Sequence, residues 1–535
     1  MKSADSKQSE ETNSGWGQGG ARVTDLWLCL LIAGLVGILV PLDDADLPLH
    51  LLTGDWIRAH GELPVVEPFA WTREGAPYFA YSWLPQIGYS WAWQVGGVNG
   101  LSLLHGALLM GVVWALWDLA RVAEWSLWSS RLMLSLHMLL WMFVQPATRP
   151  QLVLAIALPL AWASAFRVRN NRHALGACAA LACASAVAVN SHLLFPLMAA
   201  PVVVLLCATP VRWATVAAWT ASLLLGWMCT PYLLELPALL RLNFGYNALF
   251  NAASPIKEHE AGFVFVTHAA VGTALVVALL LLQPLFPSFA NRASRERWWY
   301  GLSWAAGLVL FGLAIRGLLL WWLLALPVVA WSVAALPLPR TRLVQRVLPW
   351  AWGVGVLGML GQPLRLRAER SRVGPELSHP EAHALEPIVA WLKCASPSAD
   401  VGAMRRAVGV EHAVLKGTAS FNTGSYLAWA VPYVSWSIDG RTIFPDSVAR
   451  AEARQELRLG AVVHPPLHDA QVVVLPVAHA TNRLLAASEG WQRVALPATD
   501  SARAYALWWR AGSRGSAPSS AGTVAKARCD MTGTP

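Results

Sequence analysis

Two aspartates one residue apart, followed by a histidine, form the strongest chemical feature of the sequence. Asp44 and Asp46 come just after the first long apolar run, and His50 follows in the stretch DADLPLHLLTG. Two carboxylates at this spacing can hold a metal ion, or one can accept a proton while the other orients it. The alternative interpretation is a hydrated loop that caps a helix end. His50 is a candidate for orienting a carboxylate or contacting substrate, although a lone histidine beside apolar residues is more often structural.

Further polar side chains lie between later apolar runs. Arg149 and Arg316 are candidate phosphate-binding residues, because a guanidinium binds phosphate through a bidentate fork. The alternative for each is ordinary snorkelling at a membrane interface. His192 is a candidate substrate-binding residue, with a structural role as its alternative. The group Glu258-His259-Glu260 suits either a metal site or a solvated loop, and we favour the loop.

The composition indicates a membrane protein. Of 535 residues, 56% are hydrophobic and only 13% are charged, whereas soluble globular proteins carry roughly 25% charged residues. Apolar runs recur through the first two thirds, and in hydrocarbon such runs must become helices. We therefore expect about eleven membrane-spanning helices. The expected ranges are 25–42, 98–120, 131–146, 150–166, 174–189, 193–209, 213–230, 263–286, 299–315, 317–336 and 347–362.

The distribution of Lys and Arg predicts the orientation. The more basic set of loops includes the N-terminus and the turns at Arg121, Arg167 and Arg295, and basic loops favour the cytoplasm. The N-terminus is then cytoplasmic and everything after residue 362 lies outside. This orientation also places the unusual polar residues together on the outer side. It follows from the Lys and Arg distribution alone, without reference to any motif. Ionisable groups at membrane depth are costly and are functional candidates by default.

The fold class is therefore mostly α: a polytopic transmembrane bundle with an extracytoplasmic α/β domain at the C-terminus. We expect a disordered tail over 1–24, the membrane domain over 25–362 with a first outer loop at 43–97, and a linker over 363–378. The outer α/β domain spans 379–510 and a second disordered tail spans 511–535. The formal charge of +9 does not indicate nucleic-acid binding, because the basic residues are scattered and form no stripe. No zinc-ligand spacing is present in the sequence, so no metal ligands are assigned.

The first outer loop resembles a bacterial family of integral membrane proteins related to the GT-C glycosyltransferases. The matching residues are Asp44, Asp46, His50, Leu51, Thr53, Gly54, Trp56, Ile57, His60, Gly61, Pro64, Glu67, Pro68, Phe69, Thr72, Trp83, Leu84 and Gln86. Later matches are Arg149-Pro150-Gln151, Asn190 with His192, Pro231-Tyr232, the Arg316 region, Asn422-Thr423-Gly424-Ser425-Tyr426-Leu427 and Ile438-Asp439-Gly440-Arg441. The sequence departs from the family pattern at Ser82, where an acidic residue is common, and at Leu193, where glycine is common.

This resemblance implies transfer of a sugar from a polyprenyl-phosphate donor to a glycan, lipid or protein acceptor outside the cytoplasm, by inverting displacement. It implies Asp44 and Asp46 as proton acceptor and orienting carboxylate, with Arg149 and Arg316 on the departing phosphate. His50 and His192 complete the expected substrate contacts. No cofactor is assigned, and a divalent metal is compatible but not required. The expected location is the inner (plasma) membrane.

Two other functions fit the same sequence. One is a non-catalytic membrane assembly or export factor that keeps the fold without the chemistry, which the departures at Ser82 and Leu193 favour slightly. The other is a lipid or solute transporter, a class that commonly shows inverted repeats. The hydropathy of this chain shows no inverted repeat.

Overall fold

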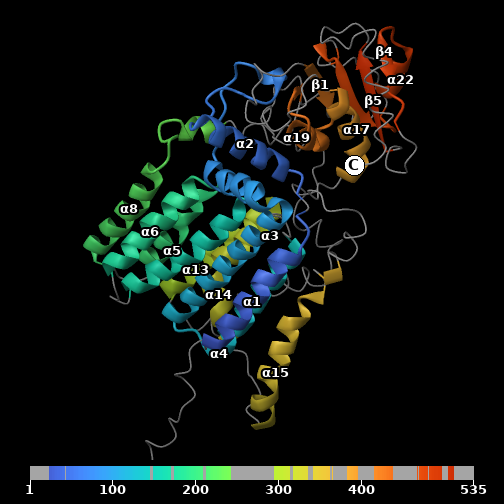
Figure 1. Cartoon of the computed structure of the whole chain (residues 1–535). Helices are drawn as coiled ribbons and strands as arrows, with labels where there is room; N and C mark the ends of the chain where they lie inside the picture. Colours follow the sequence, from blue (N-terminus) through green and yellow to red (C-terminus); the bar gives the residue numbers. More distant parts are fainter. Residues whose placement is uncertain are drawn as a thin grey trace, which may run out of the picture.

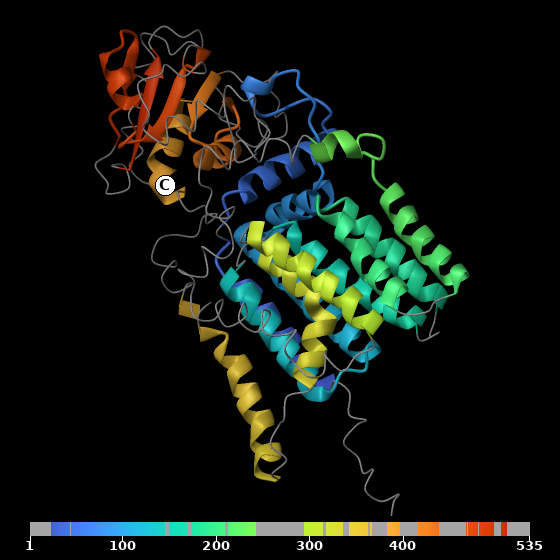
Figure 2. The same ribbon diagram turned by 180° about the vertical axis from the view of Figure 1, so that it is seen from behind.

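The computed structural model is mostly helical, with a small mixed sheet near the C-terminus (Figure 1). It describes residues 23–42, 44–144, 149–169, 174–208, 212–241, 294–313, 317–334, 342–361, 364–365, 382–395, 415–437, 467, 469–479, 481–496 and 504–510. The bundle contains α1 (Val23–Leu39), α3 (Trp83–Val122), α4 (Leu127–Val144), α5 (Gln151–Arg169), α6 (Ala174–Val189), α7 (Ala199–Ala208), α8 (Trp213–Met228), α13 (Ser294–Leu313) and α14 (Gly317–Ala334). Another helix, α15 (Arg342–Gly358), lies along one side of the bundle (Figures 1 and 2).

The bundle has one continuous apolar core, to which all of these helices contribute. Small residues let the helices approach closely: a Cβ added to Gly37 of α1 would lie 2.5 Å from Cα of Gly106 in α3. Large aromatic residues fill the spaces between other helices. Trp162, for example, is fully buried and donates a hydrogen bond to the backbone oxygen of Leu323 at 3.2 Å.

The expectation of about eleven spans is not confirmed by the described residues. Only α3 and α5 are both long and apolar enough to cross a bilayer, and four other apolar helices are shorter, at 10–17 residues. The range expected at 193–209 is divided into a 3-10 turn, η2 (Phe195–Met198), and α7, because Pro196 enters at the start of the turn. The expected span at 263–286 lies outside the described residues.

The helix α3 begins much earlier than expected. It starts at Trp83 instead of residue 98 and runs for 40 residues, with a break at Gly97, where φ is 55° and ψ is −136°. Only glycine adopts this backbone conformation readily. The break separates an outer segment, which belongs to the first outer loop in sequence, from the segment that crosses the bundle.

The remainder of the first outer loop lies between the bundle and the C-terminal sheet (Figures 1 and 2). Its helix α2 (Leu47–His60) buries residues such as Leu47, Leu51 and Ile57, exposes its last turn and ends at Gly61, where φ is 72°. A short 3-10 turn, η1 (Trp71–Arg73), follows. The loop therefore contains short helical segments joined by turns.

The C-terminal sheet has five strands: β1 (Leu415–Ala419), β2 (Val434–Trp436), β3 (Val472–Pro476), β4 (Trp491–Arg493) and β5 (Tyr505–Arg510). Their order is β2-β1-β3-β5-β4; β1, β2 and β3 are parallel, whereas β5 is antiparallel to β3 and β4. The helices α17 (Ala382–Ala395) and α19 (Phe421–Ala430) pack on one face, and α22 (Thr481–Ala487) packs on the other. This mixed sheet with its helices agrees with the α/β fold expected for the C-terminal region.

Candidate functional site

A buried ion pair lies at the end of the bundle that carries the first outer loop. Arg149, just before α5, donates from Nε to Oδ2 of Asp44 at 2.8 Å and from Nη2 to Oδ1 at 3.2 Å. The side chain of Asp44 is 0% exposed and that of Arg149 is 15% exposed. Bidentate pairs of this kind fix both partners geometrically. The structure therefore brings together two residues that the sequence separates by two expected membrane-spanning ranges, 98–120 and 131–146.

Asp46 lies beside this pair and is the more accessible of the two carboxylates. Its Oδ2 is 3.9 Å from Nη2 of Arg149, and its side chain is 40% exposed. Its backbone N–H donates to Oδ1 of Asp44 at 3.0 Å, so Asp44 fixes the start of α2. Both oxygens of Asp44 thus accept hydrogen bonds inside the protein, whereas Asp46 faces the accessible side. This geometry suits Asp44 to orientation and Asp46 to proton transfer.

His50 is half-buried in the first turn of α2, behind the carboxylates. Its Nδ1 is 3.1 Å from Nε2 of Gln86, and its ring lies 6.1 Å from that of Tyr89. Burial lowers the pKa of His50 from 6.5 to about 4; Asp44 opposes the shift and Arg149 adds to it. Since an imidazole is neutral above its pKa, His50 carries no charge near pH 7.

Asn190 bonds to the ends of three bundle helices and not to Asp44 or Asp46. Its Oδ1 accepts from Nε1 of Trp83 at 2.8 Å, and its Nδ2 donates to the backbone oxygens of Ala186 and Cys229. These bonds tie together the ends of α3, α6 and α8. His192 accepts from the backbone N–H of Leu194 at 3.1 Å, a contact that orders the turn after α6.

The remaining candidates cannot be placed in this site. Arg316, the group Glu258-His259-Glu260 and the Asp439-Gly440-Arg441 stretch lie outside the described residues. The structure adds Tyr89, which the sequence analysis did not single out, and Gln86, which it named only as part of the family pattern. Gln86 and Tyr89 are three residues apart on one helix, and this spacing could have indicated that their side chains share a face.

Glu67 has a structural role in the first outer loop. Its Oε1 accepts from the backbone N–H groups of Phe69 and Ala70 at 3.0 and 3.1 Å. Its Oε2 lies 3.7 Å from Nε of Arg73, and both side chains are buried. A carboxylate with these partners holds the loop in shape.

The C-terminal sheet docks directly on this loop. Trp71 donates from Nε1 to the backbone oxygen of Gly417 at 2.9 Å, and Thr72 donates to that of Ser437. From the sheet, Ser435 donates to the backbone oxygen of Phe69 at 2.8 Å. A single apolar cluster includes residues of α2, the outer part of α3 and the sheet. We call these contacts of residues 69–72 with β1 and β2 the loop–sheet seam.

The described charged residues around Asp44 leave one net negative charge. Arg149 balances one carboxylate of the Asp44–Asp46 pair, and His50 is neutral. Among the described residues, no group of three His, Cys, Asp or Glu side chains is placed to hold a metal ion.

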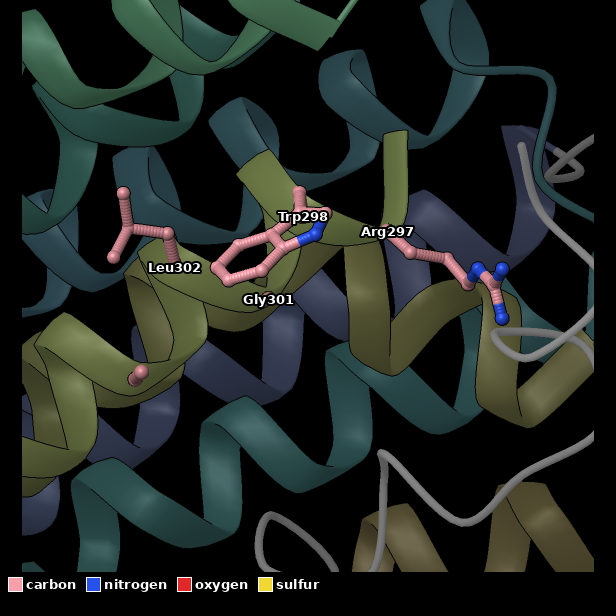
Figure 3. A pocket seen from close by; sticks show the side chains of 5 residues that line it. Arg297, Trp298, Gly301 and Leu302 are labelled. Carbon is pink, nitrogen blue, oxygen red and sulfur yellow. The ribbon is translucent and has the colours of Figure 1, made fainter. Parts of the chain in front are cut away.

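A separate hollow of about 430 Å³ lies along α13 (Figure 3). It is lined by Arg297, Trp298, Gly301, Leu302 and Ala305. None of the candidate site residues lines it, and Arg297 belongs to the basic loops that the sequence places in the cytoplasm. It is therefore distinct from the outer site.

Comparisons with known proteins identify the fold. No model of a known protein family matches the sequence, and no curated protein sequence matches it. Solved structures do match. The oligosaccharyltransferase of Archaeoglobus fulgidus, in its apo form, has a TM-score of 0.54 and 12% identity, with 85% of this chain and 69% of that chain covered. The same archaeal enzyme, AglB, in complex with an inhibitory peptide and a dolichol-phosphate, has a TM-score of 0.53 at the same identity and coverage.

The second type of match is the arabinofuranosyltransferase AftD from Mycobacteria. It has a TM-score of 0.53 and 14% identity, and covers 93% of this chain. This chain spans only 40% of the length of AftD. Both neighbours are GT-C-type membrane glycosyltransferases. The resemblance predicted from the first outer loop is confirmed at the level of the fold: the chain has the fold of the GT-C glycosyltransferases.

Proposed function

We propose that this chain is a membrane glycosyltransferase that moves a sugar from a polyprenyl-phosphate donor to an acceptor outside the cytoplasm. The observation that carries the proposal is the Asp44–Arg149 pair with Asp46 beside it, at one end of a GT-C fold. Two structural neighbours support it, since one is an oligosaccharyltransferase solved with a dolichol-phosphate and the other an arabinofuranosyltransferase.

In the proposed reaction, Asp46 accepts the proton of an acceptor hydroxyl, which is a poor nucleophile until it loses that proton. The hydroxyl oxygen attacks the anomeric carbon as the bond to the phosphate oxygen breaks, and the bonding electrons leave with the lipid phosphate. Attack opposite the leaving group inverts the configuration at that carbon. Asp44 holds Arg149 and the start of α2 in place. Arg149 and Arg316 are proposed to stabilise the phosphate, and His50 and His192 to contact substrate.

We further propose that the site faces the outside of the inner membrane, with the N-terminus in the cytoplasm. Two ion pairs support this orientation at the opposite end of the bundle. Arg131 donates to both oxygens of Asp25 at 2.9 and 2.8 Å, and Arg167 pairs with Asp118. All four residues lie near helix ends that the charge pattern assigns to the cytoplasm. About eleven spans remain our proposal for the whole chain.

The test measures sugar transfer from a polyprenyl-phosphate donor to an acceptor by the purified full-length protein. The probes are undecaprenyl- and decaprenyl-phosphates that carry a radiolabelled monosaccharide, with an envelope extract from a deletion strain as acceptor. We expect the wild type to release polyprenyl phosphate and label the extract, and Asp46→Asn to abolish both at unchanged protein level. Glu62→Gln is the matched control, because Glu62 is an exposed carboxyl group of the same loop. Wild-type transfer that survives in Asp46→Asn refutes the assignment. Normal envelope glycans in a strain that expresses Asp46→Asn favour an assembly factor instead.

A further inference from the structure

The outer end of α3 carries a buried polar stripe. Ser82, Gln86 and Tyr89 follow one another at helical spacing, so they share one face of the helix. Each is less than a tenth exposed. Within the part of the chain that the structure describes, three side-chain oxygens of this stripe have no hydrogen-bond partner: Ser82 Oγ, Gln86 Oε1 and Tyr89 Oη. Buried polar atoms without partners are uncommon in native proteins, and each demands an explanation.

Gln86 connects this stripe to the candidate site. Its Nε2 lies 3.1 Å from Nδ1 of His50, and no described residue bonds to the other ring nitrogen of His50. The orientation of the Gln86 amide follows from its partners. With Nε2 toward His50, one amide N–H is bonded, while the second N–H and the carbonyl oxygen have no described partner. The flipped amide would bury two N–H donors without an acceptor, and orphaned N–H groups are rarer than under-satisfied oxygens.

A hydrogen bond from the Gln86 amide fixes the tautomer of His50. A neutral imidazole has one N–H donor and one acceptor nitrogen. When Nδ1 accepts from Gln86, the ring proton must be on Nε2. The imidazole is then a neutral N–H donor, so it adds no positive charge to the Asp44, Asp46 and Arg149 group.

We infer that Gln86 is a positioning residue that holds His50 as a neutral Nε2–H donor to an oxygen of the sugar-phosphate donor. This inference rests on the proposed function. It assigns His50 a hydrogen-bonding role, and leaves proton transfer to Asp46. Gln86 acts only through His50 and does not itself contact the reacting atoms.

The first test measures the tautomer and does not depend on activity. The full-length protein is labelled with ¹⁵N-histidine and reconstituted in lipid nanodiscs. The chain has 14 histidines, so the signals of His50 are identified by their loss in His50→Gln. We expect an unprotonated Nδ1 and a protonated Nε2 in the wild type, and a mixture of tautomers in Gln86→Leu. A protonated Nδ1 in the wild type, or an unchanged ratio in Gln86→Leu, overturns the inference.

The second test measures the pH dependence of transfer. In Gln86→Glu the carboxylate can only accept from Nδ1–H, so it reverses the tautomer and favours the imidazolium. We expect kcat to fall by about tenfold with little change in KM, which is the effect of losing about one hydrogen bond that is made in the transition state. We also expect the acid limb of the profile to move to higher pH.

Gln94→Glu is the matched control for this substitution. Gln94 lies two turns further along α3, is exposed and accepts from Arg58. An equal change in the two variants would refute the role of Gln86. If the wild type transfers no sugar, the proposed function fails while the tautomer measurement still decides the role of Gln86.

Discussion

Arg149 donates to both carboxylate oxygens of Asp44, at 2.8 and 3.2 Å, and so joins the start of α5 to the segment after α1. Asp44 in turn accepts the backbone N–H of Asp46 at 3.0 Å. The ion pair therefore fixes where the accessible carboxylate lies. Asp44 is therefore expected to contribute mainly to stability and Asp46 mainly to proton transfer, and substitutions can measure the two roles separately.

Removing Arg149 is expected to destabilise the protein strongly. Arg149→Met leaves the fully buried Asp44 without its partner, which costs about 3–5 kcal/mol for a buried pair. Asp46→Asn should change stability little, because its side chain is 40% exposed. Thermal unfolding in detergent, followed by tryptophan fluorescence, measures both. Arg58→Met, at an exposed arginine of α2, is the control. Similar melting temperatures for Arg149→Met and Arg58→Met would contradict the buried pair.

The helices α2 and α3 pack closely at Gly54, where there is no room for a larger side chain. A Cβ at Gly54 would lie 2.1 Å from the backbone oxygen of Gln86 and 2.7 Å from Cβ of Ser90. Backbone atoms cannot move aside cheaply, so Gly54→Ala should push α2 away from α3 and abolish transfer. Gly88→Ala should be neutral, since nothing lies within 4 Å of the added Cβ. Limited proteolysis of the first outer loop compares the two, and equal resistance to cleavage would count against this packing.

The sequence places Asp44 and Asp46 directly after the first apolar run, and the structure places them between α1 and α2, because this position depends only on local order along the chain. Their catalytic role stays a prediction. It also predicted that Arg149 lies on the same side as Asp44, since this follows from counting apolar runs. It did not predict that Arg149 would neutralise Asp44, which depends on how α1 and α5 end. The contact between Trp71 and Gly417 joins residues 346 positions apart, and no periodicity encodes such a pairing. The expected number of spans is not confirmed among the described residues, because hydropathy alone does not show where a helix is divided, as the range 193–209 is at Pro196.

The pH dependence of the free energy of unfolding should show that His50 is neutral in the folded protein. Its pKa is about 4 in the folded protein, below the ordinary 6.5 expected in the unfolded chain. Between these values the unfolded state binds more protons, so the contribution of His50 to stability rises with pH and is complete above about 6.5. Unfolding free energies of the wild type and His50→Gln across pH 4 to 7 give this contribution by difference. A difference that does not vary with pH, or that shrinks as pH rises, would contradict a neutral His50.

The loop–sheet seam attaches the C-terminal sheet to the first outer loop, although the two lie far apart in sequence. Trp71→Phe keeps the ring but removes the bond from Nε1 to Gly417, and Ser435→Ala removes the bond to Phe69. Each lost hydrogen bond costs about 1 kcal/mol. Neither variant should unfold the bundle, because its core does not include the seam.

We expect the double variant Trp71→Phe/Ser435→Ala to raise amide hydrogen exchange in residues 67–80 and 415–437, and to lower transfer. Trp91→Phe is the control, since Trp91 is 60% exposed on α3. Faster exchange in both segments together would show that the loop and the sheet open as one unit. If exchange rises in the sheet alone while transfer is unchanged, the sheet does not position the loop. Asp46 would then depend on Arg149 and the α2–α3 contact alone, since these attach the loop to the bundle without the sheet.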